Sequence, residues 1–171
     1  LAKHLYNNKL KIINCELYKE RHAISNFLGS PKGYVDSDKG SDVLEYIKYN
    51  PECVLLFDEI EKAHPDFYDI LLTFFDDGVI TDKNGDIIDG RRCLFILTTN
   101  TGSQNLDLSP IGFKSPTQTD KNNKIQSAIS KKFSPEFLNR LDETCYFNKI
   151  DNFENILLVE FAKIQQFMSE K

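Results

Sequence analysis

The 171-residue chain contains no tryptophan, one methionine and four cysteines. The cysteines (Cys15, Cys53, Cys93 and Cys145) are widely spaced and form no CxxC pair, which argues against a structural zinc site. Each of them falls in a strand-like run, where a cysteine is usually a small buried hydrophobe. We therefore expect free thiols, a reducing compartment and no structural metal.

Two further absences narrow the class of protein. No apolar run approaches the ~18 residues that a membrane span requires, and the first residues, LAKHLYNNKLK, lack the apolar core of a signal peptide. The formal net charge is -5, so no basic excess points to nucleic acid. Hydrophobic residues make up 40% of the chain and charged residues 27%, an ordinary balance for one globular domain with a sizeable core. We expect a soluble protein that binds neither a membrane nor nucleic acid.

Strand-like runs alternate with helical segments, which predicts an α/β fold with a parallel sheet. The runs are KIINC at 11–15, CVLLF at 53–57, CLFILTT at 93–99 and TCYF at 144–147. CVLLF and CLFILTT are apolar throughout, as expected for strands covered on both faces. Helices are expected over 21–28, 42–49, 65–75, 124–133 and 151–171.

One hairpin and two loops interrupt this alternation. VITDKNGDII predicts a β-hairpin, because Asn84-Gly85 is a strong signal for a type I′ turn. The segments GSPKGYVDSDKGS (29–41) and LSPIGFKSPTQTDKNNK (108–124) have the composition of loops. The second loop contains Ile111-Gly112-Phe113, two large apolar side chains that a plain polar loop does not need.

Two acidic residues follow the run CVLLF, in VLLFDEIEKAH. In a parallel sheet, Asp58 and Glu59 would lie at the carboxyl edge, where such sheets bind their ligands. One carboxylate there can hold Mg²⁺ through water, and the next can polarise an attacking water molecule. For this motif taken alone, a solvated strand end with two acids is the alternative.

Asn100 and Arg140 are further candidate site residues. Asn100 follows the run CLFILTT, where a side-chain amide can bind a γ-phosphate or orient water; the alternative is an asparagine that only turns the chain. Arg140, in FLNRLDE, suits a phosphate reached from outside, because a guanidinium group binds phosphate oxygens in pairs. The alternative for Arg140 is an ion pair with Asp142 or Glu143.

Several segments together resemble the second AAA+ module of Clp-family unfoldases (ClpA, ClpB and ClpC) over nearly the whole chain. They are GSPKGYVDSDKG, VLLFDEIEKAHPDFYDILLTFFDDGVITDKNGDIID, ILTTNTGS and FSPEFLNRLDE, in this order and at these spacings. The resemblance implies an AAA+ P-loop NTPase large subdomain over 1–148 and the first helix of the small helical subdomain over 149–171. It also implies ATP and Mg²⁺ as ligands, a homo-hexameric ring, and unfolded or tagged proteins as substrates.

The resemblance gives the site residues their roles. Asp58 and Glu59 match the Walker B acids, with Asp58 holding Mg²⁺ through water and Glu59 activating the attacking water. Asn100 matches the sensor of the γ-phosphate. Arg140 matches the arginine finger, which in the family reaches the ATP of the neighbouring subunit. These residues are the expected catalytic set, and Asp58 and Asn100 also bind the nucleotide.

Gly33-Tyr34-Val35 matches the family's pore loop. An aromatic residue next to an aliphatic one can grip an extended polypeptide of any sequence by burial. The alternative is a loop anchor packed into its own domain. The chain departs from the family pattern at two positions: Asp36 stands where glycine is usual and Lys32 where proline is usual. Asp36 adds charge and reduces backbone freedom.

Ile111-Gly112-Phe113 resembles the tripeptide with which ClpA- and ClpC-like members dock into pockets of a ClpP-type peptidase. Disaggregases generally lack it, so the tripeptide favours a ClpC-like member over a ClpB-like one. The alternative is that Ile111 and Phe113 fold back onto their own domain.

The family's phosphate loop, GxxxxGK[ST], and the central strand before it occur nowhere in the chain. We therefore expect a fragment of a longer Clp ATPase that binds ATP poorly by itself, because the backbone cradle for the phosphates is missing. The competing hypotheses are a non-hydrolysing scaffold that kept the fold and a ClpB-like disaggregase that acts without a peptidase. The excess of lysine over arginine suits an AT-rich genome, which favours a plastid interior, with an apicomplexan plastid ClpC as one candidate and the cytoplasm as the alternative.

Overall fold

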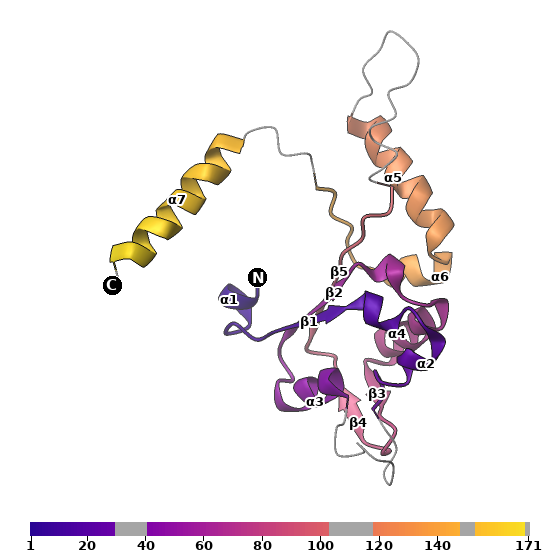
Figure 1. Cartoon of the computed structure of the whole chain (residues 1–171). Coiled ribbons are helices and arrows are strands. Elements are labelled where there is room, and N and C mark those ends of the chain that lie inside the picture. Colours follow the sequence, from indigo (N-terminus) through magenta and orange to yellow (C-terminus); the bar gives the residue numbers. More distant parts are fainter. Residues whose placement is uncertain (30–40, 103–117, 148–152, 170–171) are drawn as a thin grey trace.

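A computed structural model describes residues 1–29, 41–102, 118–147 and 153–169 of the chain (Figure 1). Its body is an α/β unit on a three-stranded parallel sheet with the strand order β1-β2-β5. The strands are β1 (Leu10–Asn14), β2 (Val54–Asp58) and β5 (Leu94–Leu97). Leu10 pairs with Val54, and Val54 with Leu94, so the strands start level and share one carboxyl edge. The expected α/β fold with a parallel sheet is confirmed.

The helices follow the sequence expectations in order but not always in length. They are α1 (Ala2–Leu5), η1 (Cys15–Tyr18), α2 (Arg21–Ile24), α3 (Asp42–Tyr49), η2 (Ile60–Lys62), α4 (Pro65–Asp77), α5 (Gln118–Lys132), α6 (Pro135–Leu138) and α7 (Phe153–Ser169), where η marks a 3-10 helix. Helix α3 has the expected bounds, and α4 extends slightly beyond them. Helix α2 ends well before the expected residue 28, and α5 begins before the expected residue 124.

Local capping explains where α3 and α4 begin and end. The hydroxyl of Ser41 accepts a hydrogen bond from the backbone N–H of Leu44 and so caps α3. Pro65 occupies the first turn of α4, where a missing N–H costs nothing. Gly78 ends α4 in the left-handed conformation, with φ 67. A Cβ atom at Gly78 would also collide with Cγ of Arg91, so a larger residue there would meet both strain and a clash.

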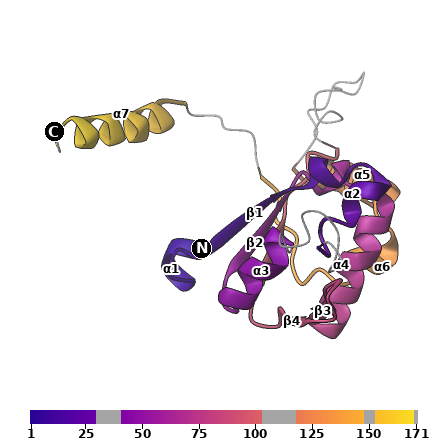
Figure 2. The ribbon, with the colours of Figure 1, turned by 60° about the horizontal axis from the view of Figure 1, so that its bottom comes forward.

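The hydrophobic core lies against one face of the sheet. Ile13 of β1 and Phe57 of β2 are buried on this face, and α2, α4 and α6 lie together beside it in both views (Figures 1 and 2). Aromatic rings fill the space between the elements: Tyr18 stacks on Phe67 with centroids 4.6 Å apart, and Phe27 meets Phe67 edge-on at 5.1 Å. Rings of this size carry much of the burial that stabilises a core.

The opposite face of the sheet is less covered than the sequence indicated. Val54 is buried there, but Leu56 and Ile96 are only partly buried and Ile12 is 59% exposed. The expectation that the central strands are covered on both faces is therefore wrong for the described residues. Their second apolar face is a partly open surface.

Strands β3 (Val79–Thr81) and β4 (Ile87–Asp89) form the expected antiparallel hairpin, but its turn is not type I′. Gly85 has φ 86, whereas Asn84 does not have the positive φ that a type I′ turn requires at both central residues. The carboxylate of Asp82 organises the turn instead, since its Oδ1 accepts from the backbone N–H groups of Asn84 and Asp86, both at 2.8 Å.

The segment TCYF at 144–147 is not the strand that the sequence predicted. It has no regular structure, and Phe147 is 95% exposed. A strand needs a neighbour to pair its backbone groups, and no strand among the described residues lies beside this segment. Helix α7 lies apart from the body in both views (Figures 1 and 2). Within the described residues, no helix has the length and apolar character needed to span a membrane.

Candidate active site

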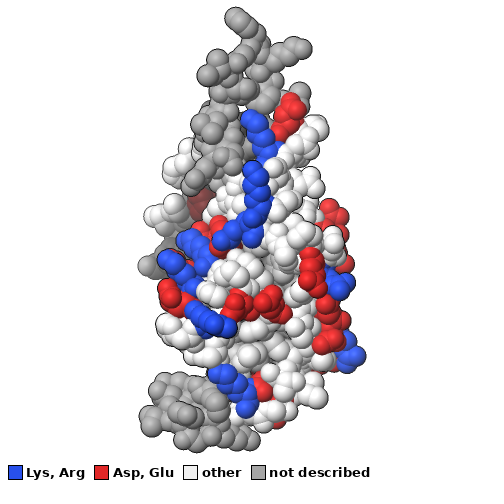
Figure 3. Space-filling model, turned by 90° about the vertical axis from the view of Figure 1, so that its right-hand side faces the viewer, with Lys and Arg blue, Asp and Glu red and all other residues white. Residues whose placement is uncertain are grey.

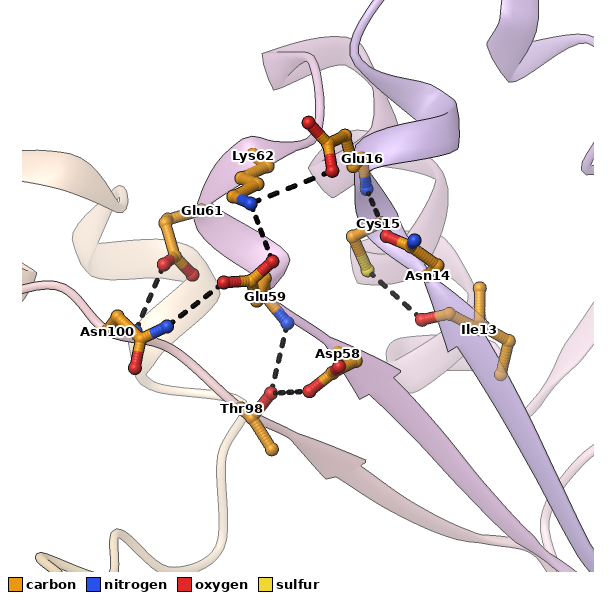
Figure 4. Close-up of polar contacts among 10 residues, drawn as sticks. All are labelled: Ile13, Asn14, Cys15, Glu16, Asp58, Glu59, Glu61, Lys62, Thr98 and Asn100. Carbon is orange, nitrogen blue, oxygen red and sulfur yellow. Dashed lines mark hydrogen bonds and ion pairs between the residues drawn. The ribbon is translucent and has the colours of Figure 1, made fainter.

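The carboxyl edge of the parallel sheet brings three predicted site residues together (Figure 4). Asp58 ends β2, Glu59 follows it, and Asn100 lies just beyond β5. Asn100 donates a hydrogen bond from Nδ2 to Oε1 of Glu59 at 3.0 Å. The acidic pair and the amide therefore form one cluster, as the parallel arrangement of the strands predicted.

Thr98 joins the two acidic residues. Its hydroxyl donates to Oδ1 of Asp58 at 2.6 Å and accepts from the backbone N–H of Glu59 at 3.0 Å. Its backbone N–H donates to the carbonyl of Phe57 at 2.9 Å, and its carbonyl accepts from the N–H of Ile60 at 3.0 Å. Sequence reasoning missed this residue. The strand register could have found it, because continuing the pairing of Phe57 with Leu97 places residue 98 opposite Asp58.

Glu59 has a left-handed backbone, with φ 53 and ψ 53. This conformation costs a non-glycine residue roughly 1–2 kcal/mol, and residues held in it cluster at functional sites. The two hydrogen bonds from the N–H groups of Glu59 and Ile60 to Thr98 hold the strained turn in place. The turn directs the Glu59 side chain between Asn100 and Lys62 (Figure 4).

Lys62 forms an ion pair with Glu59, with Nζ 2.6 Å from Oε2. The same ammonium group lies 3.7 Å from Oε2 of Glu16, in η1. The hydrogen bond to Glu59, together with the charge of Glu16, raises the pKa of Lys62 above its ordinary value, so this side chain stays protonated at neutral pH. Sequence reasoning missed Lys62, because its contact with Glu59 depends on the left-handed backbone of Glu59, which the sequence does not show.

Hydrogen-bonding contacts of Glu61 and Tyr68 fix the segment between the acidic pair and α4. Oε1 of Glu61 accepts from the backbone N–H of Asn100 at 3.0 Å, while its Oε2 is buried without a hydrogen-bond partner among the described residues. The hydroxyl of Tyr68, on α4, lies 3.1 Å from the carbonyl oxygen of Ile60 and 3.2 Å from that of Ala63. Burial raises the pKa of Tyr68 to about 12, so its hydroxyl remains a donor.

The Asp58 carboxylate has the chemistry of a magnesium ligand. It is exposed, and Thr98 occupies Oδ1 only, which leaves Oδ2 for a ligand. Mg²⁺ in nucleotide sites is held by one or two carboxylates together with phosphate oxygens and water. No group of three or more His, Cys, Asp or Glu residues in the described part of the chain could hold a metal ion. A single exposed carboxylate therefore fits Mg²⁺ that arrives with a nucleotide.

Arg140 does not belong to this cluster. Its guanidinium group pairs with Asp76, near the end of α4, and no hydrogen bond or ion pair joins it to Asp58, Glu59 or Asn100. The alternative partners considered from the sequence, Asp142 and Glu143, are not its partners in the structure.

The two loop motifs lie outside the described residues. The pore-loop match Gly33-Tyr34-Val35 and the docking-tripeptide match Ile111-Gly112-Phe113 therefore stay predictions from the sequence. On the face shown in Figure 3, several basic side chains adjoin one another in the upper half, and acidic side chains lie beside and below them.

Comparison with known proteins identifies relatives of the chain. The family model described as "AAA domain (Cdc48 subfamily)" matches residues 1–144. Chaperone protein ClpB 1 of Synechococcus elongatus is 36% identical over 175 residues, which cover 100% of this chain and 20% of that protein. ClpB of Lactococcus lactis subsp. cremoris is 35% identical over 174 residues, covering 99% of this chain and 20% of that protein.

Two solved structures of Hsp104 are also similar. One is the closed state with ATPγS and FITC-casein, with a TM-score of 0.82 and 34% identity over 96% of this chain and 29% of that one. The other is the extended S. cerevisiae Hsp104–casein complex, with a TM-score of 0.80 and 34% identity over 93% of this chain and 27% of that one.

The parallel sheet and the acidic pair at its carboxyl edge define an AAA+ module. The chain belongs to the AAA family, and among AAA+ proteins it is similar to ClpB and Hsp104. It spans about a fifth of the length of the curated relatives it matches, as the 20% coverage of each shows.

Proposed function

We propose that the protein hydrolyses ATP and uses the energy to unfold other proteins, as a chaperone that threads polypeptide through the pore of a homo-hexameric ring. The observation that carries this proposal is the joint placement of Asp58, Glu59 and Asn100 at one strand edge. This placement provides an acceptor for the proton of an attacking water and an amide beside it. Family membership supports ATP as the nucleotide.

The roles of these side chains follow from their chemistry. Glu59 accepts a proton from water as the water attacks the γ-phosphate, a contribution of about 10²- to 10⁴-fold for a positioned base. Asn100 orients the water or binds a γ-phosphate oxygen through its amide. Asp58 would hold Mg²⁺ through water, and a bound Mg²⁺ would supply positive charge next to the phosphates.

Arg140 acts in this proposal as an arginine finger on the ATP of a neighbouring subunit. Its separation from the acidic cluster of its own chain supports a role in trans. Such an arginine stabilises negative charge on the transferring phosphate and contributes about 10³- to 10⁵-fold. A finger supplied by a neighbour makes activity depend on the ring.

The proposed substrates are unfolded or tagged proteins. The sequence support is Gly33-Tyr34-Val35, in which Tyr34 and Val35 provide an apolar grip that reads no particular sequence. The two similar Hsp104 structures contain casein. In this proposal the large subdomain of the AAA+ module spans 1–148 and the first helix of its small subdomain spans 149–171. Helix α7, set apart from the body, is compatible with that boundary.

Two versions of the function differ in what happens to the unfolded chain. In the first, Ile111-Gly112-Phe113 docks onto a ClpP-type peptidase, which degrades the product, as expected of a ClpC-like member. In the second, the protein acts alone as a disaggregase, a version favoured by the similarity to ClpB and Hsp104. For localisation we propose a plastid, with the cytoplasm as the alternative. This proposal rests only on the excess of lysine over arginine, which suits an AT-rich genome.

No phosphate loop occurs within these 171 residues. ATP hydrolysis is therefore proposed for the protein as its gene encodes it, and the 171 residues alone are expected to be inactive. A scaffold that kept the fold without hydrolysis is the competing hypothesis. The intact geometry of Asp58, Glu59 and Asn100 argues against it, because a scaffold does not need these contacts.

The test uses the gene-encoded protein with fluorescent casein as substrate, in the presence and absence of a ClpP-type peptidase. ATP-dependent unfolding followed by peptide release supports the peptidase-coupled version, and its loss in Ile111→Ser/Phe113→Ser with unchanged ATP turnover would assign the docking role. ATP-dependent recovery of aggregated protein without peptide release supports the disaggregase. Absence of ATP turnover in a hexameric preparation contradicts the proposal and favours the scaffold.

A further inference from the structure

We propose that Lys62 is a positioning residue whose ammonium group holds the Glu59 carboxylate in the orientation needed to accept a proton from the attacking water. This inference rests on the proposed function, in which Glu59 is the base. It adds Lys62, a residue of the 3-10 helix η2, to the residues that act in the site.

The Glu59 carboxylate is held at both of its oxygens (Figure 4). Oε1 accepts from Nδ2 of Asn100 at 3.0 Å, and Oε2 pairs with Nζ of Lys62 at 2.6 Å. Two donors on two different oxygens fix the plane of the carboxylate, which a single donor would leave free to rotate. An ionised carboxylate has about four lone-pair sites, so two remain for a water molecule.

The position of Lys62 follows from the backbone. The left-handed residue Glu59 starts a tight turn in which the N–H of Lys62 donates to the carbonyl of Glu59 at 2.9 Å. This places the two side chains three residues apart on one side of η2. Tyr68 lies within hydrogen-bonding distance of the carbonyl oxygens of Ile60 and Ala63 on the same turn, which keeps the lysine aimed at the carboxylate.

Glu16 supports Lys62 from the neighbouring strand end. Its Oε2 lies 3.7 Å from Nζ of Lys62, and Asn14 fixes the start of η1 by accepting from the backbone N–H of Glu16 at 3.0 Å. The ammonium group therefore lies between carboxylates that follow β1 and β2. This second contact restricts the conformations that the long lysine side chain can adopt.

The exposure of the pair suits a base that water must reach. The Glu59 side chain is 32% exposed and the Lys62 side chain 39% exposed. At this exposure the net stabilisation of the fold by an ion pair is small. Its effect on geometry is larger, because a displacement of a reacting group by about 1 Å can cost roughly 10²-fold in rate. We therefore expect Lys62 to matter for turnover and little for stability.

The first experiment compares Lys62→Met, Lys62→Arg and Lys19→Met in the gene-encoded protein. Lys19 is the matched control, since it lines the same pocket of about 410 Å³ as Lys62 and Glu16 but pairs with no carboxylate in the described part of the chain. We expect Lys62→Met to lower kcat by about 10- to 100-fold with little change in KM for ATP. Lys62→Arg, which keeps a charged donor, restores most of the loss, and Lys19→Met behaves as wild type.

A double-mutant cycle separates positioning from a general structural effect. In a Glu59→Gln background, positioning predicts that Lys62→Met causes little further loss of turnover, because its target is gone. A structural role would lower turnover by the same factor in both backgrounds, and that result would overturn the inference. An unchanged or raised kcat in Lys62→Met would overturn it too. Lys62→Gln, with size-exclusion and thermal-unfolding controls, replaces Lys62→Met if the latter does not assemble.

The Glu59→Gln variant also separates this inference from the proposed function. If Glu59→Gln retains wild-type turnover, the assignment of the base fails and the inference fails with it. If Glu59→Gln loses turnover while Lys62→Met does not, only the role of Lys62 is wrong.

Discussion

Thr98 donates its hydroxyl hydrogen to Asp58 across the ends of β5 and β2, at 2.6 Å. The oxygen of the same hydroxyl accepts the backbone N–H of Glu59, so one side chain fixes both the proposed magnesium ligand and the strained residue beside it. This bridge links the two strand ends that carry the candidate site.

Thr98→Val keeps the shape of the side chain and removes both hydrogen bonds. The N–H of Glu59 then lacks its partner, which we expect to destabilise the protein by about 1–3 kcal/mol and to lower ATP turnover. Denaturant unfolding and steady-state kinetics measure the two effects.

Thr98→Ser should preserve both stability and ATP turnover, because serine keeps the hydroxyl group. Thr99→Val is the matched control, because among the described residues the Thr99 hydroxyl bonds to Thr101 and not to the acidic pair. Equal effects of Thr98→Val and Thr99→Val would contradict the bridge.

Arg140 should act on a neighbouring subunit. Arg140→Ala and Glu59→Gln subunits should each form rings with little ATP turnover. Mixed rings should regain activity, because some neighbours then combine an intact Glu59 with an intact Arg140. Turnover of mixtures at several ratios measures this. Mixtures as inactive as the parents, with exchange of subunits shown by labelling, would contradict a role in trans.

Asp76 should hold the Arg140 guanidinium in place through their ion pair. Asp76→Asn removes the charge that orients the arginine, so we expect turnover in the ring to fall while nucleotide binding is kept. The neighbouring Asp77, also in the last turn of α4, provides the control Asp77→Asn. If both variants turn over ATP as wild type does, the pair has no part in placing the finger.

The alkylation rates of the cysteines test how tightly the core next to the candidate site is packed. Burial raises the pKa of Cys15 to about 12, with added repulsion from Asp58 and Glu61, and burial raises the pKa of Cys53 to about 12 as well. Both thiols should remain protonated and unreactive at pH 8, whereas the exposed Cys145 should be alkylated quickly. Mass spectrometry after timed treatment with iodoacetamide measures the three rates. Labelling of Cys15 as fast as that of Cys145 would contradict the packing of η1 against the sheet.

The parallel sheet and the cluster of Asp58, Glu59 and Asn100 could be predicted from the sequence, because apolar strands that alternate with helices must end at one edge. The positions of Thr98 and Lys62 could not be read in the same way. The first depends on strand register, and the second depends on the left-handed backbone of Glu59. Neither is visible in composition or periodicity.

Long-range partners account for two other failures. Arg140 pairs with Asp76 on α4, whereas sequence reasoning considered only its near neighbours Asp142 and Glu143. The segment 144–147 has strand-forming residues but no strand beside it among the described residues. At the hairpin, local chemistry was misjudged: the Asp82 carboxylate supplies the turn's hydrogen bonds, so Asn84 need not take a positive φ.

The most direct test of the account is the ATP turnover of Glu59→Gln in the gene-encoded protein, measured beside Glu45→Gln, an exposed glutamate of α3. Glutamine keeps the size of the side chain and can still bond with Asn100, but it cannot accept a proton from water. We predict that Glu59→Gln lowers kcat by about 10²- to 10⁴-fold while ATP binding and ring assembly are kept, and that Glu45→Gln is unaffected. Wild-type turnover in Glu59→Gln would contradict the central claim that this carboxylate is the base for ATP hydrolysis.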